Sequence, residues 1–504
     1  MHVEVVVVVV ITVLAGALRF TRLGAQSYWL DETISVDLVH LPLHPLLLAI
    51  RFQEQTPPLY YTVAWVWAKV FGADEFGLRS LSALLGTATV PVSYLAARTL
   101  ATRRAAALAA LLVALSPILV WYSQEARSYA LFTFLSALSF LFFARTLAKY
   151  SAFDLVAWSL SSAAALTTHY FAGFLILCEA LWLIRRVSRR KALAIAFAPL
   201  VLLQLALLPL IHSQQAQHGT RLATKPIDVR LRQFGTWYLT GHFRAAAPIV
   251  VAALAVLVGV WLLLRRTGGV QRAGGLIALS VGLGAPAVAA VVSATVVDYF
   301  VFRNLINIWV PLAIALAIGF TGRRAGWLGV GAAVALCVVF FVSDLAVMTR
   351  SSLQRDDWRS VAPIVAGSTH PAAIVVYPRY GTRPLYYYAK PKLRCLGCGP
   401  SARYTAAQRH GLRVRDLWFV AVHAPFEGFG HDYTSWLPPD KVRFNVPGGF
   451  RETEVIRLQH FELRHFVATS TQRVSVSRLE RSVAGPFGVQ VLVPSGSRRL
   501  LPCC

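Results

Sequence analysis

The sequence predicts an all-α polytopic membrane protein with about 11 transmembrane helices, followed by a small α/β domain. Of the 504 residues, 56% are hydrophobic and only 14% are charged, a composition far too apolar for an ordinary soluble protein. Apolar runs of about 20 residues recur, which is the length that a helix needs to cross a bilayer. After residue 348 the chain becomes polar and rich in arginine, so we expect a membrane domain over 1–348 and an extracytoplasmic domain over 349–504.

The apolar runs define the expected spans in order. They cover roughly 3–19, 78–97, 105–122, 128–147, 153–168, 170–185, 192–211, 246–264, 274–294, 304–321 and 326–347. The first run has almost no basic region before it and no small-residue cleavage site, so we expect a retained helix rather than a removed signal peptide. The run 57–72, PPLYYTVAWVWAKVFG, is too short to span. We therefore expect an interfacial or re-entrant helix there, within an outer loop over 20–77.

Basic residues set the expected orientation. They gather in five loops on one side of the eleven-span arrangement, namely Arg98, Arg103 and Arg104; Arg145 and Lys149; 185–191; Arg265, Arg266 and Arg272; and Arg323 and Arg324. By the positive-inside rule this side is cytoplasmic, and the loops 20–77 and 212–245 face outward together with the C-terminal domain. Because this pattern accounts for the net charge of +26, we expect no nucleic-acid partner.

The C-terminal domain shows strand and helix signals. AAIVVYP (372–378), DLWFVAVHAP (416–425) and FGVQVLVP (487–494) predict short buried strands, and Asp357 is a predicted N-cap of a helix that follows it. The polar domain also holds four cysteines, Cys395, Cys398, Cys503 and Cys504. They are compatible with disulfides in an oxidising compartment or with a four-thiolate zinc site, and we favour disulfides.

Two adjacent carboxylates, Asp31 and Glu32, stand in SYWLDETISVDLVH directly after the first span. Apolar neighbours disfavour the charged form of a carboxylate, which suits a general base. The alternative is that Asp31 caps a short helix beginning ETISVDLV, a role that Asp fills well. Sequence alone leaves both interpretations open, with capping slightly favoured.

Other polar residues recur at outward turns. Arg127 in YSQEARSYAL offers a planar fork of donors to an anionic phosphate, although a water-exposed hairpin tip explains it equally well. Arg303 begins an otherwise apolar helix, where an unpaired charge is costly. We predict a shared cavity on this face, with substrate-binding side chains at Glu54, Glu125, His169 and Tyr170.

In combination these segments resemble the polyprenyl-phosphate-sugar-dependent glycosyltransferases of the GT-C superfamily, in particular the protein O-mannosyltransferase and aminoarabinose transferase group, and are similar to glycosyltransferase family 39. The resemblance covers WLDE in the first outer loop, TPPLYY, FGADEFGLRSLSALLG, YSQEARSYAL, THYFA and FRNLINIWVPLAIALAIG. Two departures stand out. Thr56 stands where mannosyltransferases commonly show His before the two prolines, and the tail does not resemble their β-trefoil.

The resemblance implies an inverting transfer of a sugar from a polyprenyl-phosphate donor to an acceptor hydroxyl on the outer face of the membrane. Asp31 would be the catalytic base, and Glu32 would orient the acceptor or a divalent metal, Mg²⁺ or Mn²⁺. Arg127 and Arg303 would bind the donor phosphate. The acceptor (protein, lipid or polysaccharide) is not specified by the sequence. A transporter or flippase for a lipid-linked sugar is the alternative, although transporters more often place ionisable groups at mid-membrane and show internal repeats.

Overall fold

The computed structural model describes residues 2–218, 227–295, 298, 300–368, 370–389, 393–396, 411–422, 443–484 and 489–494. The chain forms two compact units, one of residues 1–24 and 35–353 and the other of residues 25–34 and 354–504. The expected domain boundary after residue 348 lies at the end of the last long helix, Gly326–Thr349.

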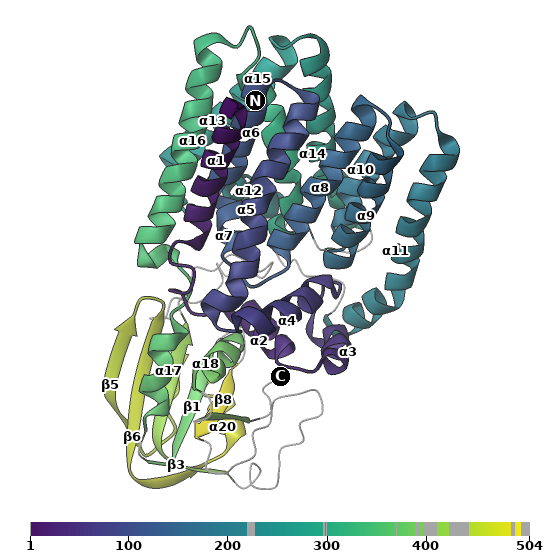
Figure 1. Ribbon diagram of the computed structural model, residues 1–504. Coiled ribbons are helices and arrows are strands. Elements are labelled where there is room, and N and C mark those ends of the chain that lie inside the picture. The colour runs from purple at the N-terminus through teal and green to yellow at the C-terminus, as the bar shows by residue number, and fades with distance from the viewer. Residues whose placement is uncertain are drawn as a thin grey trace. The chain divides into compact units, whose positions relative to one another are not determined.

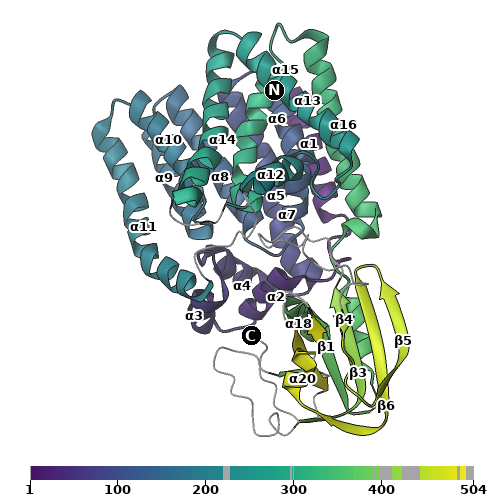
Figure 2. The same cartoon turned by 180° about the vertical axis from the view of Figure 1, so that it is seen from behind.

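The first unit is a helix bundle (Figure 1). Its helices are α1 (His2–Phe20), α3 (Leu43–Gln53), α4 (Leu59–Phe71), α5 (Glu75–Leu100), α6 (Arg103–Leu115), α7 (Pro117–Ser123), α8 (Tyr129–Ala148), α9 (Ala152–Thr168), α10 (Ala172–Arg186), α11 (Arg190–His218), α12 (Ile227–Thr240), α13 (Ala246–Arg265), α14 (Gly269–Thr295), the 3₁₀ helix η1 (Phe302–Ile308), α15 (Trp309–Phe320) and α16 (Gly326–Thr349). Figures 1 and 2 show α9, α10 and α11 on one side of the bundle and α13 and α16 on the other.

Helices occupy all of the stretches predicted as spans. In the described part of the chain, eight are long and apolar enough to cross a membrane, and the bent pair α6 and α7 raises the number to nine. Helices α9 and α10 have only 17 and 15 residues. The chain is a multi-pass membrane protein, as predicted. The short apolar run 57–72 forms α4, a helix of 13 residues.

The junction of α6 and α7 shows how a broken span satisfies its backbone. Pro117 has no N–H and cannot continue α6, so carbonyls of the preceding turn lose their helical donors. Arg19, fully buried in α1, donates to the carbonyls of Val113 and Ala114 at 3.1 and 2.9 Å, and its Nε donates to Ser123 Oγ at 3.2 Å. The arginine thus replaces the missing donors and joins α1 to both halves of the broken helix.

Gly86 of α5 lies against this junction. A Cβ atom at Gly86 would lie 2.0 Å from Ser123 Oγ, 2.8 Å from Ser123 Cβ and 3.0 Å from Arg19 Nε. Rotation of the serine side chain cannot relieve the clash, because Ser123 Cβ is fixed to the backbone. Only glycine fits here without displacing α7.

Gly86→Ala is therefore expected to destabilise the protein, although alanine is the better helix former by about 1 kcal/mol. Overpacking costs about 1–3 kcal/mol, and the shift also breaks the Arg19 to Ser123 hydrogen bond. We expect a lower unfolding temperature in detergent. The matched control is Gly16→Ala, whose Cβ would meet its nearest neighbour, Thr87 Cγ2, at 3.6 Å. Equal unfolding temperatures for the two variants would refute the close-packed junction.

The second unit is a six-stranded sheet in the order β2-β8-β1-β3-β6-β5. The strands are β1 (Ala372–Tyr377), β2 (Leu393–Leu396), β3 (Leu412–Val422), β5 (Phe450–Leu458), β6 (Phe461–Val474) and β8 (Gln490–Pro494), with β4 (Arg443–Phe444) and β7 (Val483–Ala484) forming a separate pair. Only β1 and β3 are parallel, and the other pairings in this sheet are antiparallel.

Helices cover the sheet on both faces. Trp358 and Val361 of α17 (Trp358–Ala366) and Leu385 of α18 (Thr382–Ala389) pack on one face, while Val476 and Leu479 of α20 (Val476–Glu480) pack on the other. This burial on both sides explains why β1 is apolar at every position. The predicted strands are confirmed over their described residues, and the small C-terminal α/β domain is confirmed with them.

Candidate functional site

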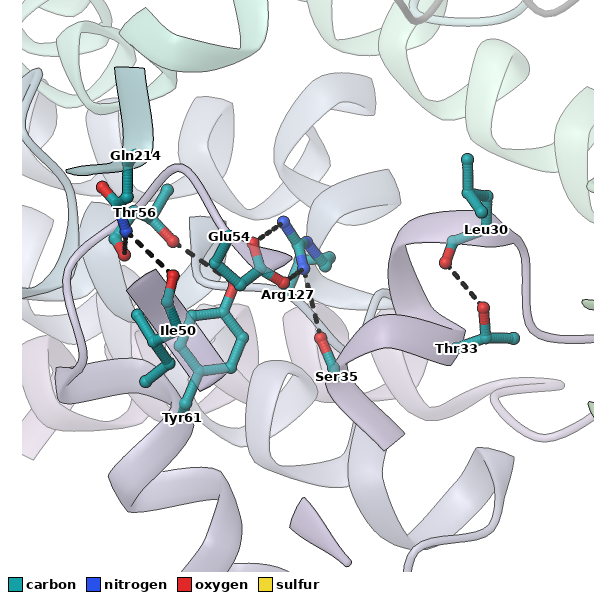
Figure 3. Close-up of polar contacts among 9 residues, drawn as sticks. All are labelled: Leu30, Thr33, Ser35, Ile50, Glu54, Thr56, Tyr61, Arg127 and Gln214. Atoms are coloured by element: carbon teal, nitrogen blue, oxygen red, sulfur yellow. Dashed lines mark hydrogen bonds and ion pairs between the residues drawn. The ribbon is translucent and has the colours of Figure 1, made fainter. Parts of the chain in front are cut away.

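A buried ion pair links two turns of the helical unit. Arg127, in the turn between α7 and α8, donates from both terminal nitrogens to Glu54 at the end of α3, with N–O distances of 2.5 and 2.9 Å. Both side chains are buried, with 8% of the Arg127 side chain and 2% of the Glu54 side chain exposed. Arg127 also donates to Ser35 Oγ at 3.3 Å, so it joins α3 to α2 (Leu30–Val39). Figure 3 shows the guanidinium between Glu54 and Ser35. The sequence placed Arg127 and Glu54 at outward turns but did not predict that they pair.

Tyr61 of α4 completes this arrangement. Its hydroxyl lies 3.3 Å from Thr56 Oγ1, and its ring centroid lies 5.8 Å from the Arg127 guanidinium carbon. Burial raises the pKa of Tyr61 well above its ordinary value, while the charge of Arg127 acts in the opposite direction. The phenol therefore stays neutral and keeps its proton for donation.

Gln214, near the end of α11, connects further residues to the pair. Its amide nitrogen donates to the carbonyls of Ile50 and Thr56 at 3.3 and 3.1 Å, and its oxygen accepts from Tyr170 at 2.9 Å. We call the set Ser35, Glu54, Thr56, Tyr61, Arg127 and Gln214 the Arg127 cluster (Figure 3). The polar residues in HSQQAQH at the end of a long apolar helix were the signal by which sequence reasoning could have found Gln214.

The positive charges of two arginines act on the side chain of His169. Its ring stacks on Phe132 with centroids 4.7 Å apart, and its Nδ1 accepts from the backbone N–H of Phe171 at 3.3 Å. Burial, and then the charges of Arg303 and Arg127, lower the pKa of His169 to about 3. His169 is therefore neutral at physiological pH, with its proton on Nε2. Arg303 and Arg127 lie near enough to act on the same ring.

Glu125 and Arg303 are the other predicted site residues of this unit. Glu125 is 1% exposed, and its carbonyl accepts from the N–H of Arg127 at 2.8 Å. Arg303 is half-buried in the first turn of η1. Asp298, a neighbour of Arg303 in the sequence, pairs instead with Arg230 through two bonds of 2.6 and 2.9 Å.

The acidic pair opens helix α2. The helix begins at Leu30, which places both acids in its first turn. Glu32 Oε2 accepts from the backbone N–H of Trp29 at 3.4 Å, the contact that the fourth residue of a capping box makes. The capping role that the sequence offered to Asp31 is thus filled by its neighbour, and Asp31 is 8% exposed in the first turn.

Residues 26–28, which precede the acids, are bound to the C-terminal part of their own unit. Gln26 Oε1 accepts from the N–H of Arg355 at 2.9 Å, and the N–H of Tyr28 donates to the Tyr388 hydroxyl at 2.6 Å. Ser27 donates to Asp357 at 2.9 Å and accepts from the N–H of Arg359 at 3.1 Å. Asp357 lies at the predicted N-cap of α17, but Ser27 supplies the capping oxygen.

The predicted metal site and the predicted disulfides are considered against the described residues. Groups of three or more His, Cys, Asp or Glu side chains suited to a metal ion are absent from the described residues. Cys398, Cys503 and Cys504 lie outside the described residues, and so does the side chain of Cys395. Cys178 and Cys337, in α10 and α16, are free thiols.

Comparisons with known proteins agree with this architecture. Residues 55–212 match the family described as dolichyl-phosphate-mannose-protein mannosyltransferase. An uncharacterised protein of Aquifex aeolicus is 31% identical over 166 residues, which are 32% of this chain and 33% of that protein. The aligned part thus spans about a third of that relative.

Two solved structures of ArnT from Cupriavidus metallidurans share the fold. The one bound to undecaprenyl phosphate has a TM-score of 0.52 and the one in the apo state 0.55, each at 14% identity over 91% of this chain and 97% of that chain. The predicted resemblance to GT-C membrane glycosyltransferases is confirmed, and the fold of this chain is of the GT-C type.

Proposed function

We propose that this protein is an inverting glycosyltransferase that moves a sugar from a polyprenyl-phosphate donor to an acceptor hydroxyl. The family match and the GT-C fold support a glycosyltransferase. The observation that carries the proposal is the Arg127 cluster, a buried and hydrogen-bonded set of polar side chains at one end of an apolar helix bundle. Buried charges in a membrane protein are costly, so their presence favours a functional site.

The proposed chemistry is a single displacement. The acceptor oxygen attacks the anomeric carbon of the sugar, its proton passes to the Asp31 carboxylate, and the bond from the anomeric carbon to the phosphate oxygen breaks. Polyprenyl phosphate leaves with both electrons of that bond, and the anomeric configuration inverts. Arg127 and Arg303 offset the charge of the leaving phosphate.

Several features support these roles. Glu54 fixes the orientation of Arg127 through both terminal nitrogens, which lowers the cost of ordering that side chain when it acts. In α2, Asp31 precedes Ser35 by four residues, a spacing that places two side chains on one face of a helix. Glu125, Tyr170 and neutral His169 are proposed contacts for the sugar or acceptor. Glu32 is proposed to orient the acceptor. Asp31 and Glu32 are also the proposed ligands of Mg²⁺ or Mn²⁺, although the displacement described above requires no metal ion.

The location follows from the same proposal. With the basic loops in the cytoplasm, the acidic helix α2 and the C-terminal domain lie outside the cell membrane. Among ArnT structures, one is bound to undecaprenyl phosphate, and a donor with this kind of lipid is proposed here. The acceptor is proposed only as a hydroxyl of a protein, lipid or polysaccharide.

The test is a donor panel with the purified protein in liposomes and a membrane extract as acceptor source. We expect transfer from at least one polyprenyl-monophosphate sugar and none from the matching nucleotide sugar. Transfer from the nucleotide sugar alone would contradict the proposal. Addition of a chelator to the same assay tests the divalent metal.

A further inference from the structure

A second charged site lies at the other end of the helical unit from α3 and α4 (Figure 1). The loop between α13 and α14 and the loop between α15 and α16 line an open pocket of about 430 Å³. Its lining includes Arg265, Arg266, Arg323 and Arg324, together with Thr267 and Gly268. We call it the arginine pocket.

Four arginine side chains bring positive charge together in this pocket. Among the described residues, none of the four arginines forms an ion pair with a carboxylate. Arg266 instead lies over the ring of Trp261, with its guanidinium carbon 5.3 Å from the centroid. Like charges gathered in one place repel each other, so binding of an anion relieves a real cost.

Two long helices add to the positive potential. Helix α14, of 27 residues, begins at Gly269, and α16, of 24 residues, begins at Gly326, each next to an arginine-bearing loop. The N-terminal end of a helix carries a partial positive charge and unpaired N–H groups, which favour phosphate. Gly268 and Gly269 have no neighbour within 4 Å of a Cβ position, so the backbone there is open to a ligand.

Apolar side chains beside the pocket indicate where the anion comes from. Trp261, Val270 and Trp327 are 43%, 85% and 89% exposed on the surface of a membrane-spanning bundle. Tryptophan at this position is typical of the level of lipid headgroups. A free phosphate ion would make no use of these side chains, whereas a phospholipid would place its acyl chains against them.

We propose that the arginine pocket binds the phosphate headgroup of an anionic phospholipid. Basic pockets between transmembrane helices on the cytoplasmic side suit such headgroups, because Arg forms forked hydrogen bonds with phosphate oxygens. This site is separate from the Arg127 cluster and does not depend on the proposed glycosyltransferase activity.

The test measures lipid binding by the purified full-length protein with native mass spectrometry and thermal unfolding in detergent. The probes are phosphatidylglycerol, phosphatidylcholine and inorganic phosphate. Phosphatidylglycerol is expected to stay bound and to raise the unfolding temperature, whereas the other two probes do neither. The double variants Arg265→Gln with Arg266→Gln, and Arg323→Gln with Arg324→Gln, are expected to retain at least tenfold less phosphatidylglycerol.

A matched control removes the same amount of charge from a similar local environment outside the pocket. Arg185→Gln with Arg186→Gln also removes two adjacent arginines at a helix end, and Arg186 lies over Trp182 as Arg266 lies over Trp261. This control is expected to bind phosphatidylglycerol like the native protein. Equal loss in control and pocket variants, or equal stabilisation by inorganic phosphate, would overturn the proposal. If a pocket variant fails to fold, equal retention of phosphatidylglycerol and phosphatidylcholine by the native protein would overturn it independently.

Discussion

Asp31→Asn is expected to lower sugar transfer at least about 100-fold, because a positioned general base contributes about 10²–10⁴-fold to a rate. Asparagine has nearly the same shape but accepts no proton, so the loss should appear in kcat rather than in KM for the donor. The measurement is the initial rate of transfer at equal amounts of folded protein. The proposal of Asp31 as base would be withdrawn if the variant kept native rates.

The same helix offers a control for this substitution. Asp37 is half-buried in α2, and Asp37→Asn removes the same charge from the same helix. We expect the control to transfer sugar at a rate within a few-fold of native. If both variants lost activity alike, the effect would belong to the helix and not to the base.

Arg127→Gln has the second large expected effect. Removing one partner of a buried ion pair leaves the other charge uncompensated and costs about 3–5 kcal/mol, and Glu54 would be that residual charge. Transfer should also fall by about 100-fold or more, because the leaving phosphate would lose a neutralising group. Unfolding temperature and initial rate measure the two effects separately.

A double-mutant cycle separates structure from catalysis. In Arg127→Gln with Glu54→Gln no buried charge is left over, so much of the stability should return while transfer stays low. Arg230→Gln is a matched control, because Arg230 forms a similar bidentate pair with Asp298. It should lose stability without the large loss of transfer. Native transfer by a stable double variant would show that the pair has a structural role only.

Local sequence signals predicted most of the helices and the buried strands of this fold. An apolar run is visible in the sequence wherever the membrane or a covered sheet requires it, as in α16 and β1. The β5 and β6 hairpin was missed, because β5 is exposed at most of its positions and has no apolar alternation. The break at Pro117 was also missed. The carbonyls that it leaves without helical donors are satisfied by Arg19, which lies 94 residues from Val113 and 95 residues from Ala114 in the sequence.

The candidate site could be predicted residue by residue but not as a set of contacts. Arg127, Glu54 and Tyr170 were expected on one face. The direct pairing of Arg127 with Glu54, and the link from Tyr170 through Gln214 to the Thr56 carbonyl, arise from tertiary packing that local sequence does not specify. The grouping of residues 25–34 with the C-terminal unit was equally invisible, because backbone N–H groups make many of the contacts. Side-chain identity reveals little about such bonds.

The most direct test of the central claim uses a polyprenyl-phosphate sugar with one label in the sugar and another in the phosphate. Liposomes containing the purified protein receive this donor together with the acceptor source. The proposed reaction predicts that the labels separate in equal amounts, the sugar to the acceptor and the phosphate to free polyprenyl phosphate. Labels that stay together in one lipid while that lipid crosses the bilayer would contradict it and favour a flippase.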